Sequence, residues 1–171
     1  SYDFLLGCPI ASYYRDVEIL ADGHRHLDEM VEALSKLPLA FHPGENWRYS
    51  VAIDVLAHVL ERATNRSLDD LLKSYIFDPL GMNDTRFCLT DAQLSRLMTL
   101  YGRLTLHEQP PLRRLEHLLE EQDPSQSYPT QSENFRRGGL GLYSTLSDYS
   151  SFVRMLLNGK SQDGQILLST T

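Results

Sequence analysis

The stretch ENWRYSVAIDVL, residues 45–56, places Tyr49 and Ser50 directly before an apolar run. A tyrosine at the start of a helix can move a proton to or from a reacting hydroxyl. It does so when positive charge lies beside it, because a free phenol has a pKa of about 10 and is a poor base at neutral pH. The same tyrosine can instead be a core aromatic that covers the end of a buried helix. Spacing alone leaves both interpretations open.

A proton-moving tyrosine needs a nucleophile, and the sequence offers none in a known motif. Acyl transfer requires an activated hydroxyl, a nearby base and an oxyanion pocket. None of the three lysines, Lys36, Lys73 and Lys160, has a serine three positions before it, so the chain holds no Ser-x-x-Lys. A Gly-x-Ser-x-Gly elbow is also missing. His42-Pro43-Gly44 matches His-x-Gly only as a string, within a turn upstream of Tyr49.

Other clusters give weaker indications of chemistry. His24 and His26 form a His-x-His pair with no further ligand nearby, so no metal site is predicted. Gly138, Gly139 and Gly141 are not followed by the lysine of a phosphate-binding loop; they indicate a backbone that packs closely beside a cleft. We therefore expect neither a metal nor an organic cofactor.

The bulk composition limits the function classes. The chain has 171 residues, 42% of them hydrophobic, and a net charge of -7. Its length indicates one globular domain with a core, and the acidic balance argues against a nucleic-acid partner. No apolar run approaches the ~20 residues of a membrane span. Cys8 and Cys88 are interpreted as two reduced thiols, although their pairing stays open.

Apolar periodicity indicates the elements that must position Tyr49. Helices are predicted over 26–36, over 50–64, after a Ser67 cap up to the Pro and Gly of 78–82, over 91–98, and from Thr145 to Asn158-Gly159. An extended stretch is expected near 99–106. Residues 107–137 are predicted to form a polar, exposed segment. Within it, residues 112–121 could form a helix with Arg113 and Arg114 on its solvent-facing side. The predicted buried faces are Ala52, Val55, Leu56, Val59, Leu60 and Ala63; Leu68, Leu71, Leu72, Tyr75 and Ile76; and Tyr149, Phe152, Val153, Leu156 and Leu157.

The order of short motifs is specific. Pro-Gly at 43–44 and Trp47 precede Tyr49-Ser50-Val51, and PLGM at 79–82 and Asp84-Thr85 follow. GGLGLYSTLSD at 138–148 and GQILLSTT at 164–171 come later. In this order the motifs resemble the class C β-lactamase-like serine hydrolases, which include class C β-lactamases, penicillin-recognising DD-peptidases and related esterases. The resemblance covers nearly the whole chain and is nearest to the esterase branch.

The resemblance implies a fold and a site. The chain is similar to the helical region of the α/β β-lactamase-like (DD-peptidase) fold. We thus expect residues 1–171 to be one mostly α fragment, with at most a short strand or hairpin. Tyr49 then corresponds to the family's catalytic tyrosine, and Ser50, Val51, Tyr2 and Gly139 to candidate substrate-binding positions. Ser50 is also a plausible helix cap, and Trp47 is expected to anchor the turn. Because Val51 stands where β-lactamases carry an asparagine, an ester substrate is favoured over a β-lactam.

These expectations concern a larger protein. The chain starts at Ser1 without a Met, so we expect the Ser-x-x-Lys segment before it and the third motif after it. The isolated chain is predicted to be inactive and to self-associate through exposed apolar surface. Three alternatives stay open for the parent: a β-lactamase, a D-amino-acid peptidase, or a non-catalytic penicillin-binding-like module. The sequence does not decide between a cytoplasmic and a periplasmic location.

Overall fold

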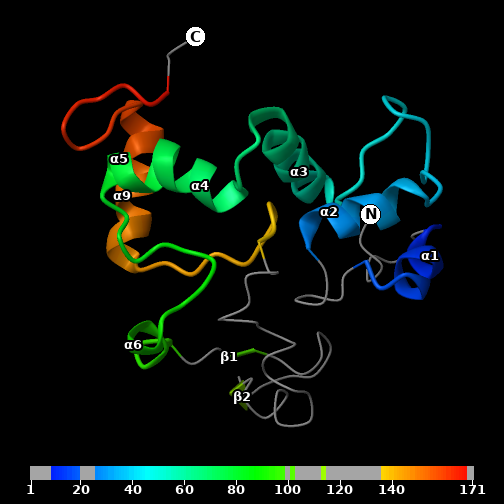
Figure 1. Cartoon of the computed structure of the whole chain (residues 1–171), viewed down its shortest axis with the longest axis horizontal. Coiled ribbons are helices and arrows are strands. Elements are labelled where there is room, and N and C mark those ends of the chain that lie inside the picture. Colours follow the sequence, from blue (N-terminus) through cyan, green and yellow to red (C-terminus); the bar gives the residue numbers. More distant parts are fainter. Residues whose placement is uncertain (1–8, 20–25, 99–100, 103–112, 115–135, 169–171) are drawn as a thin grey trace.

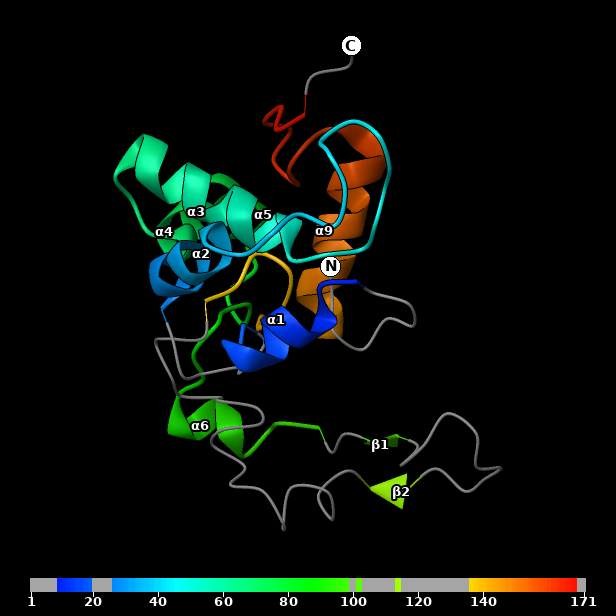
Figure 2. The ribbon, with the colours of Figure 1, turned by 90° about the vertical axis from the view of Figure 1, so that its right-hand side faces the viewer.

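The computed structural model describes residues 9–19, 26–98, 101–102, 113–114 and 136–168. The described helices are α1 Ala11–Asp16, α2 Leu27–Ser35, α3 Ala52–Thr64, α4 Leu68–Leu72, the π-helical turn η1 Lys73–Phe77, α5 Asp78–Leu80, α6 Asp91–Leu94 and α9 Leu146–Asn158. Two short strands, β1 Tyr101–Gly102 and β2 Arg113–Arg114, pair antiparallel. Figures 1 and 2 place α6 apart from the main group of helices. Within these described residues, the prediction of a mostly α chain with at most a short strand or hairpin is confirmed.

Local caps fix several helix ends where the sequence predicts them. The Ser67 hydroxyl accepts a bond from the Asp70 amide at 3.1 Å and begins α4. The Thr145 hydroxyl accepts one from the Asp148 amide at 3.2 Å and begins α9. Gly159, at φ +70°, ends α9 in the left-handed region that glycine enters freely.

The core consists of three clusters of buried apolar side chains. The first joins α1 and α2 to the start of α3, the second joins α2, α3 and α4, and the third joins η1 and α5 to α9. Their buried members are Ile10, Tyr14, Ile19, Met30 and Val51; Leu27, Ala57, Leu68 and Phe87; and Phe77, Leu80, Met82 and Met155.

The predicted buried faces of α3 and α9 are wrong. On α3, Leu56 is 51% and Val59 53% exposed, whereas Asp54 and Ala57 are each 3% exposed. On α9 the buried residues are Asp148, Ser151 and Met155, and of the predicted face only Phe152 is even half-buried. Periodicity identifies an apolar face but not the surface that covers it, and here the smaller side chains make the contacts. Leu68 and Leu71 of α4 are buried as predicted, while Tyr75 is exposed.

Two further predictions are settled in part by this structure. Arg113 and Arg114 lie in β2, so the helical option at 112–121 is wrong at these positions; the remainder of 107–135 lies outside the described residues. Where the chain is described, no helix combines the length and hydropathy needed to cross a bilayer.

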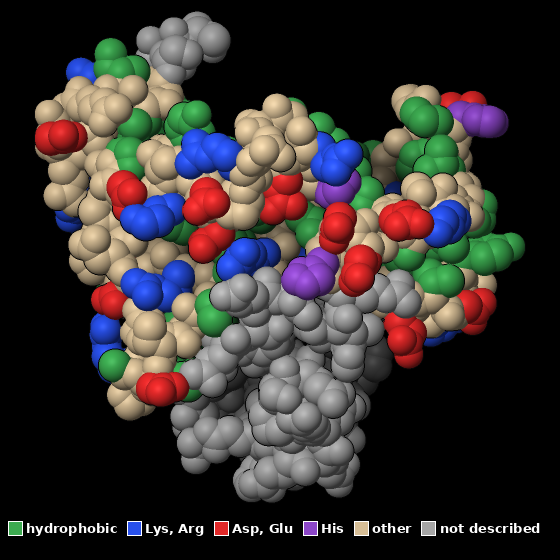
Figure 3. Space-filling view, in the orientation of Figure 1, with side chains coloured by type: hydrophobic (Ala, Val, Ile, Leu, Met, Phe, Trp, Pro, Cys, Tyr) green, Lys and Arg blue, Asp and Glu red, His purple; other side chains and the backbone are tan. Residues whose placement is uncertain are grey.

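Acidic and basic side chains alternate over α3 and α4 on the face seen in Figure 3.

Candidate functional site

Tyr49 lies in the connection between α2 and α3, two residues before the Val51 N-cap of α3. Its side chain is 56% exposed and belongs to none of the three buried clusters. The Ser50 hydroxyl accepts a bond from the Ala52 amide at 3.3 Å, which is a local cap of the first helical turn. Tyr49 is therefore an exposed phenol at the entrance to α3, a position from which it can meet a substrate.

Val51 has the opposite environment. It is 3% exposed and packs in the first cluster, whose members include Tyr14 and Met30. The Val51 side chain therefore packs the start of α3 against α1 and α2, and it does not line an open surface. It offers no amide for a hydrogen bond, as the sequence already shows.

The glycines at 138 and 139 lie against the first turns of α3. The Gly139 amide donates a hydrogen bond to Oδ1 of Asp54 at 3.3 Å. A Cβ on Gly138 would lie 2.3 Å from the carbonyl oxygen of Ile53 and 2.9 Å from Cβ of Ala57. Only glycine permits this approach of the two backbones. Both views of the ribbon show this segment next to the helices (Figures 1 and 2).

Residues 138–144, here called the strap, are also fixed at their far end. Tyr143 and Arg86 form an antiparallel bridge, with backbone bonds of 2.9 and 3.0 Å. The hydroxyls of Ser144 and Thr85 lie 2.7 Å apart. The buried Asp148 carboxylate accepts bonds from the Thr85 hydroxyl at 2.8 Å and from the Asp84 amide at 2.9 Å. The strap therefore connects α3 to the 84–86 segment and to the start of α9.

Two of the three lysines of the chain form ion pairs with nearby carboxylates. Lys36 pairs with Glu32 at 2.8 Å, and this bond holds the pKa of the Glu32 carboxyl below its usual value. Lys73 pairs with Asp78 at 2.5 Å. Lys160 forms an isolated backbone bridge with Ile166. A lysine partner for Tyr49 is thus not found among these ion pairs.

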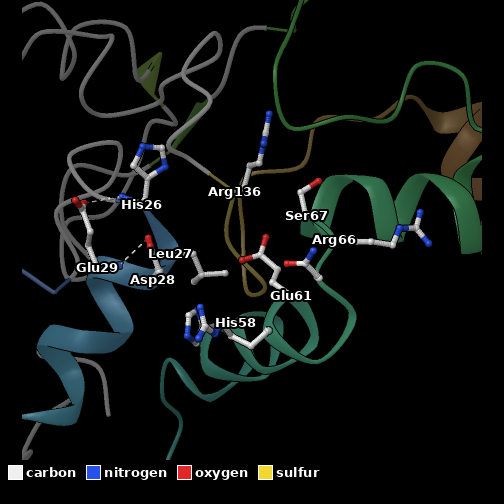
Figure 4. A pocket seen from close by; sticks show the side chains of 11 residues that line it. His26, Leu27, Asp28, Glu29, His58, Glu61, Arg66, Ser67 and Arg136 are labelled. Atoms are coloured by element: carbon white, nitrogen blue, oxygen red, sulfur yellow. Dashed lines mark hydrogen bonds between the residues drawn. The ribbon is translucent and has the colours of Figure 1, made fainter.

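A groove of about 590 Å³ lies between the start of α2, the C-terminal half of α3 and the start of α4 (Figure 4). Its lining includes His26, His58, Glu61 and Arg136, and none of the predicted site residues. In Figure 4 the Arg66 and Arg136 side chains extend away from its middle. Among the described residues no group of three potential metal ligands occurs.

The remaining predicted residues divide into described and undescribed ones. Tyr2 and Cys8 lie outside the described residues, and Cys88 is a half-buried free thiol. Trp47 is 81% exposed, so its indole does not anchor the turn by packing. Sequence reasoning missed Asp54, whose signal was a lone carboxylate inside the apolar run of α3.

Comparison with known proteins identifies the family. The family described as Beta-lactamase matches residues 11–171. Protein Rv1367c of Mycobacterium tuberculosis (strain ATCC 25618 / H37Rv) is 34% identical over 169 residues, which are 99% of this chain and 38% of that protein. Esterase EstB of Burkholderia gladioli is 46% identical over 61 residues, 36% of this chain and 16% of its own length.

A solved structure resembles the whole chain. Simvastatin synthase (LovD) from Aspergillus terreus superposes with a TM-score of 0.66 at 26% identity, over 99% of this chain and 37% of its own. The chain therefore spans well under half the length of each of these three proteins. These likenesses agree with the helical region that the motif order predicts.

Proposed function

The chain belongs to the beta-lactamase family, and on that premise we propose that the protein containing it is a serine hydrolase that cleaves carboxylic esters through an acyl-enzyme. The observation that carries the proposal is Tyr49, an exposed phenol directly before α3 in a chain whose residues 11–171 match the family. Esterase EstB, to which the chain is similar, supports an ester substrate.

In the proposed mechanism Tyr49 assists proton transfer at the attacking serine. The serine and its lysine lie outside these 171 residues, because the chain holds no Ser-x-x-Lys. A lysine ammonium beside the phenol favours the phenolate, which then accepts the serine proton as the acyl bond forms. The proton passes to the departing alcohol. Water subsequently hydrolyses the acyl-enzyme, with the same tyrosine as base.

An ester rather than a β-lactam or a D-amino-acid peptide is the proposed substrate. An amide side chain after the Tyr-Ser pair can hydrogen-bond the acylamide group of a β-lactam. Here that position holds Val51, which is buried in the first cluster. A buried aliphatic side chain supplies no such hydrogen bond.

The test uses the full-length protein. We expect p-nitrophenyl butyrate to be hydrolysed much faster than nitrocefin, and a fluorophosphonate probe to label one serine. The 171-residue chain alone should remain unlabelled. Faster turnover of nitrocefin would identify a β-lactamase instead, and a full-length protein that neither turns over nor takes up the probe would be a non-catalytic binding module.

A tyrosine pair provides the matched control. Tyr49→Phe should lower kcat/KM by about 10²- to 10⁴-fold, the usual contribution of a positioned proton-transfer group. Its unfolding midpoint should stay unchanged, because the Tyr49 side chain is mostly exposed. Tyr75→Phe removes a hydroxyl from another exposed tyrosine, on η1, and should leave kcat/KM unchanged. Equal activity of the two variants would remove Tyr49 from the mechanism.

A further inference from the structure

Asp54 is a buried carboxylate on the helix that Tyr49 precedes. Its side chain is 3% exposed, and it lies on α3 one turn after the Ser50-Val51 entrance. Buried carboxylates are rare unless a specific partner holds them. One partner here is the Gly139 amide, 85 residues away in sequence.

The contact between α3 and the strap has two parts, a close backbone approach and a hydrogen bond. Gly138 brings the strap to the backbone of Ile53 so closely that no side chain fits between them. The next residue, Gly139, is then within hydrogen-bond distance of Asp54. The far end of the strap is fixed by the bridge between Tyr143 and Arg86. At the α3 end, glycine has no side chain to interlock, so the bond from the Gly139 amide to Asp54 is the directional contact that holds this end at one register.

We propose that Asp54 is a positioning residue of the active site: it fixes the strap at one register on α3, and so sets the strap's position relative to Tyr49. The proposal rests on the proposed function in that Tyr49 is taken as the proton-transfer group. Both Tyr49 and the strap are attached to the first turns of α3. Tyr49 directly precedes the helix in the sequence, and the strap contacts the helix through Gly138 and through the Gly139 bond to Asp54. Because Gly139 is a candidate substrate-binding position, its bond to Asp54 holds that position on the same helix that begins after the phenol.

Kinetics of the full-length protein test this role. Asp54→Ala should lower kcat by about 10- to 100-fold, since small misplacement of reacting groups has effects of that size, with KM changed far less. Asp54→Asn keeps an oxygen that accepts the Gly139 bond and should restore most of kcat. Ser67→Ala, which removes the α4 cap, is the control for stability and should leave kcat unchanged. If Asp54→Ala retains wild-type kcat, or Asp54→Asn is as slow as Asp54→Ala, the proposal is wrong.

Amide exchange tests the positioning without relying on activity. In Asp54→Ala, the peptide covering 136–144 should exchange faster than in the wild type, and in Ser67→Ala it should not. Should Asp54→Ala fail to fold, Asp54→Ser replaces it, since its hydroxyl is one bond too short to reach Gly139. Unchanged exchange overturns the proposal. Loss of ester hydrolysis and of probe labelling in the wild type would overturn the proposed function alone, and the exchange comparison would still decide the role of Asp54.

Discussion

Replacing Gly138 with alanine should disrupt the contact between the strap and α3. The added Cβ would lie 2.3 Å from the carbonyl oxygen and 2.8 Å from the carbonyl carbon of Ile53. Real Cβ atoms do not come within 3.0 Å of such atoms. The obstructing atoms belong to the backbone of a helix, where the Ile53 carbonyl accepts the i+4 amide bond. They cannot rotate away as a flexible side chain would, so the strap must move.

The expected loss of stability follows from two contributions. Overpacking of a well-packed contact destabilises by about 1–3 kcal/mol, and the backbone obstruction places this case at the upper end. Movement of the strap also lengthens the bond from Gly139 to Asp54, and loss of such a bond removes about 1 kcal/mol. The sum is roughly 4 kcal/mol, and 1 kcal/mol lowers Tm by about 2–4 °C in a protein of 150–250 residues. A decrease of about 8–16 °C is therefore expected.

Thermal unfolding followed by circular dichroism measures the change, with Gly81→Ala as the control. Gly81 also sits in the main group of helices, at φ +65°, but a Cβ there would meet nothing within 4 Å. Alanine at Gly81 therefore adds only backbone strain, about 1 kcal/mol. A Tm decrease for Gly138→Ala no larger than for Gly81→Ala would refute the reasoning. Ala57→Gly removes the 2.9 Å contact but not the backbone contacts, so it should not rescue Gly138→Ala.

Three further predictions concern other parts of the chain. Phe87→Ala should destabilise by about 3–5 kcal/mol in urea unfolding, because Phe87 is 1% exposed within the second cluster; a loss under 1 kcal/mol would contradict that packing. Hydrogen bonds from Arg96 and, to a smaller extent, from Gln93 hold the pKa of the Asp84 carboxyl below its ordinary value of 3.8. The charged carboxylate should therefore stabilise the fold fully above pH 3.8, and this stabilisation should disappear as the pH falls through the lowered pKa. NMR titration should show this, and Arg96→Ala should raise the midpoint. The 171-residue chain is expected to self-associate through exposed apolar side chains such as Leu156 and Leu157, which are 55% and 79% exposed. The double variant Leu156→Glu, Leu157→Glu should therefore show a lower molecular mass in light scattering than the wild type. A monomeric wild-type chain would contradict this prediction.

Features that depend on a few neighbouring residues are predictable from the sequence. The caps of α4 and α9 and the glycine that ends α9 follow from side chains within three residues of the helix end. Their hydrogen bonds form within one turn, so the local sequence determines them. The motif order that identified the family is likewise a property of short segments.

The partner of Asp54 could not be predicted in this way. The pattern of α3 shows a carboxylate within an apolar run, but its hydrogen-bond donor comes from residue 139. The three glycines indicated close packing, without naming the helix against which Gly138 packs. Pairings across 85 residues depend on the whole fold, and one sequence gives no measure of them. The role of Val51 was hidden for the same reason, because its burial depends on α1 and α2.

The faces of α3 explain why apolar periodicity failed to predict its buried side. One face carries the large side chains Leu56, Val59 and Leu60, which are 43–53% exposed. The other carries Asp54 and Ala57, and only this narrow face lets the strap's backbone approach, since a larger residue at 57 would hold Gly138 away. The close contact thus selects small and polar residues where a core helix would carry large ones. In α3, the acid that stands three residues before an alanine within the apolar run therefore marks a backbone contact and not an interruption of the core.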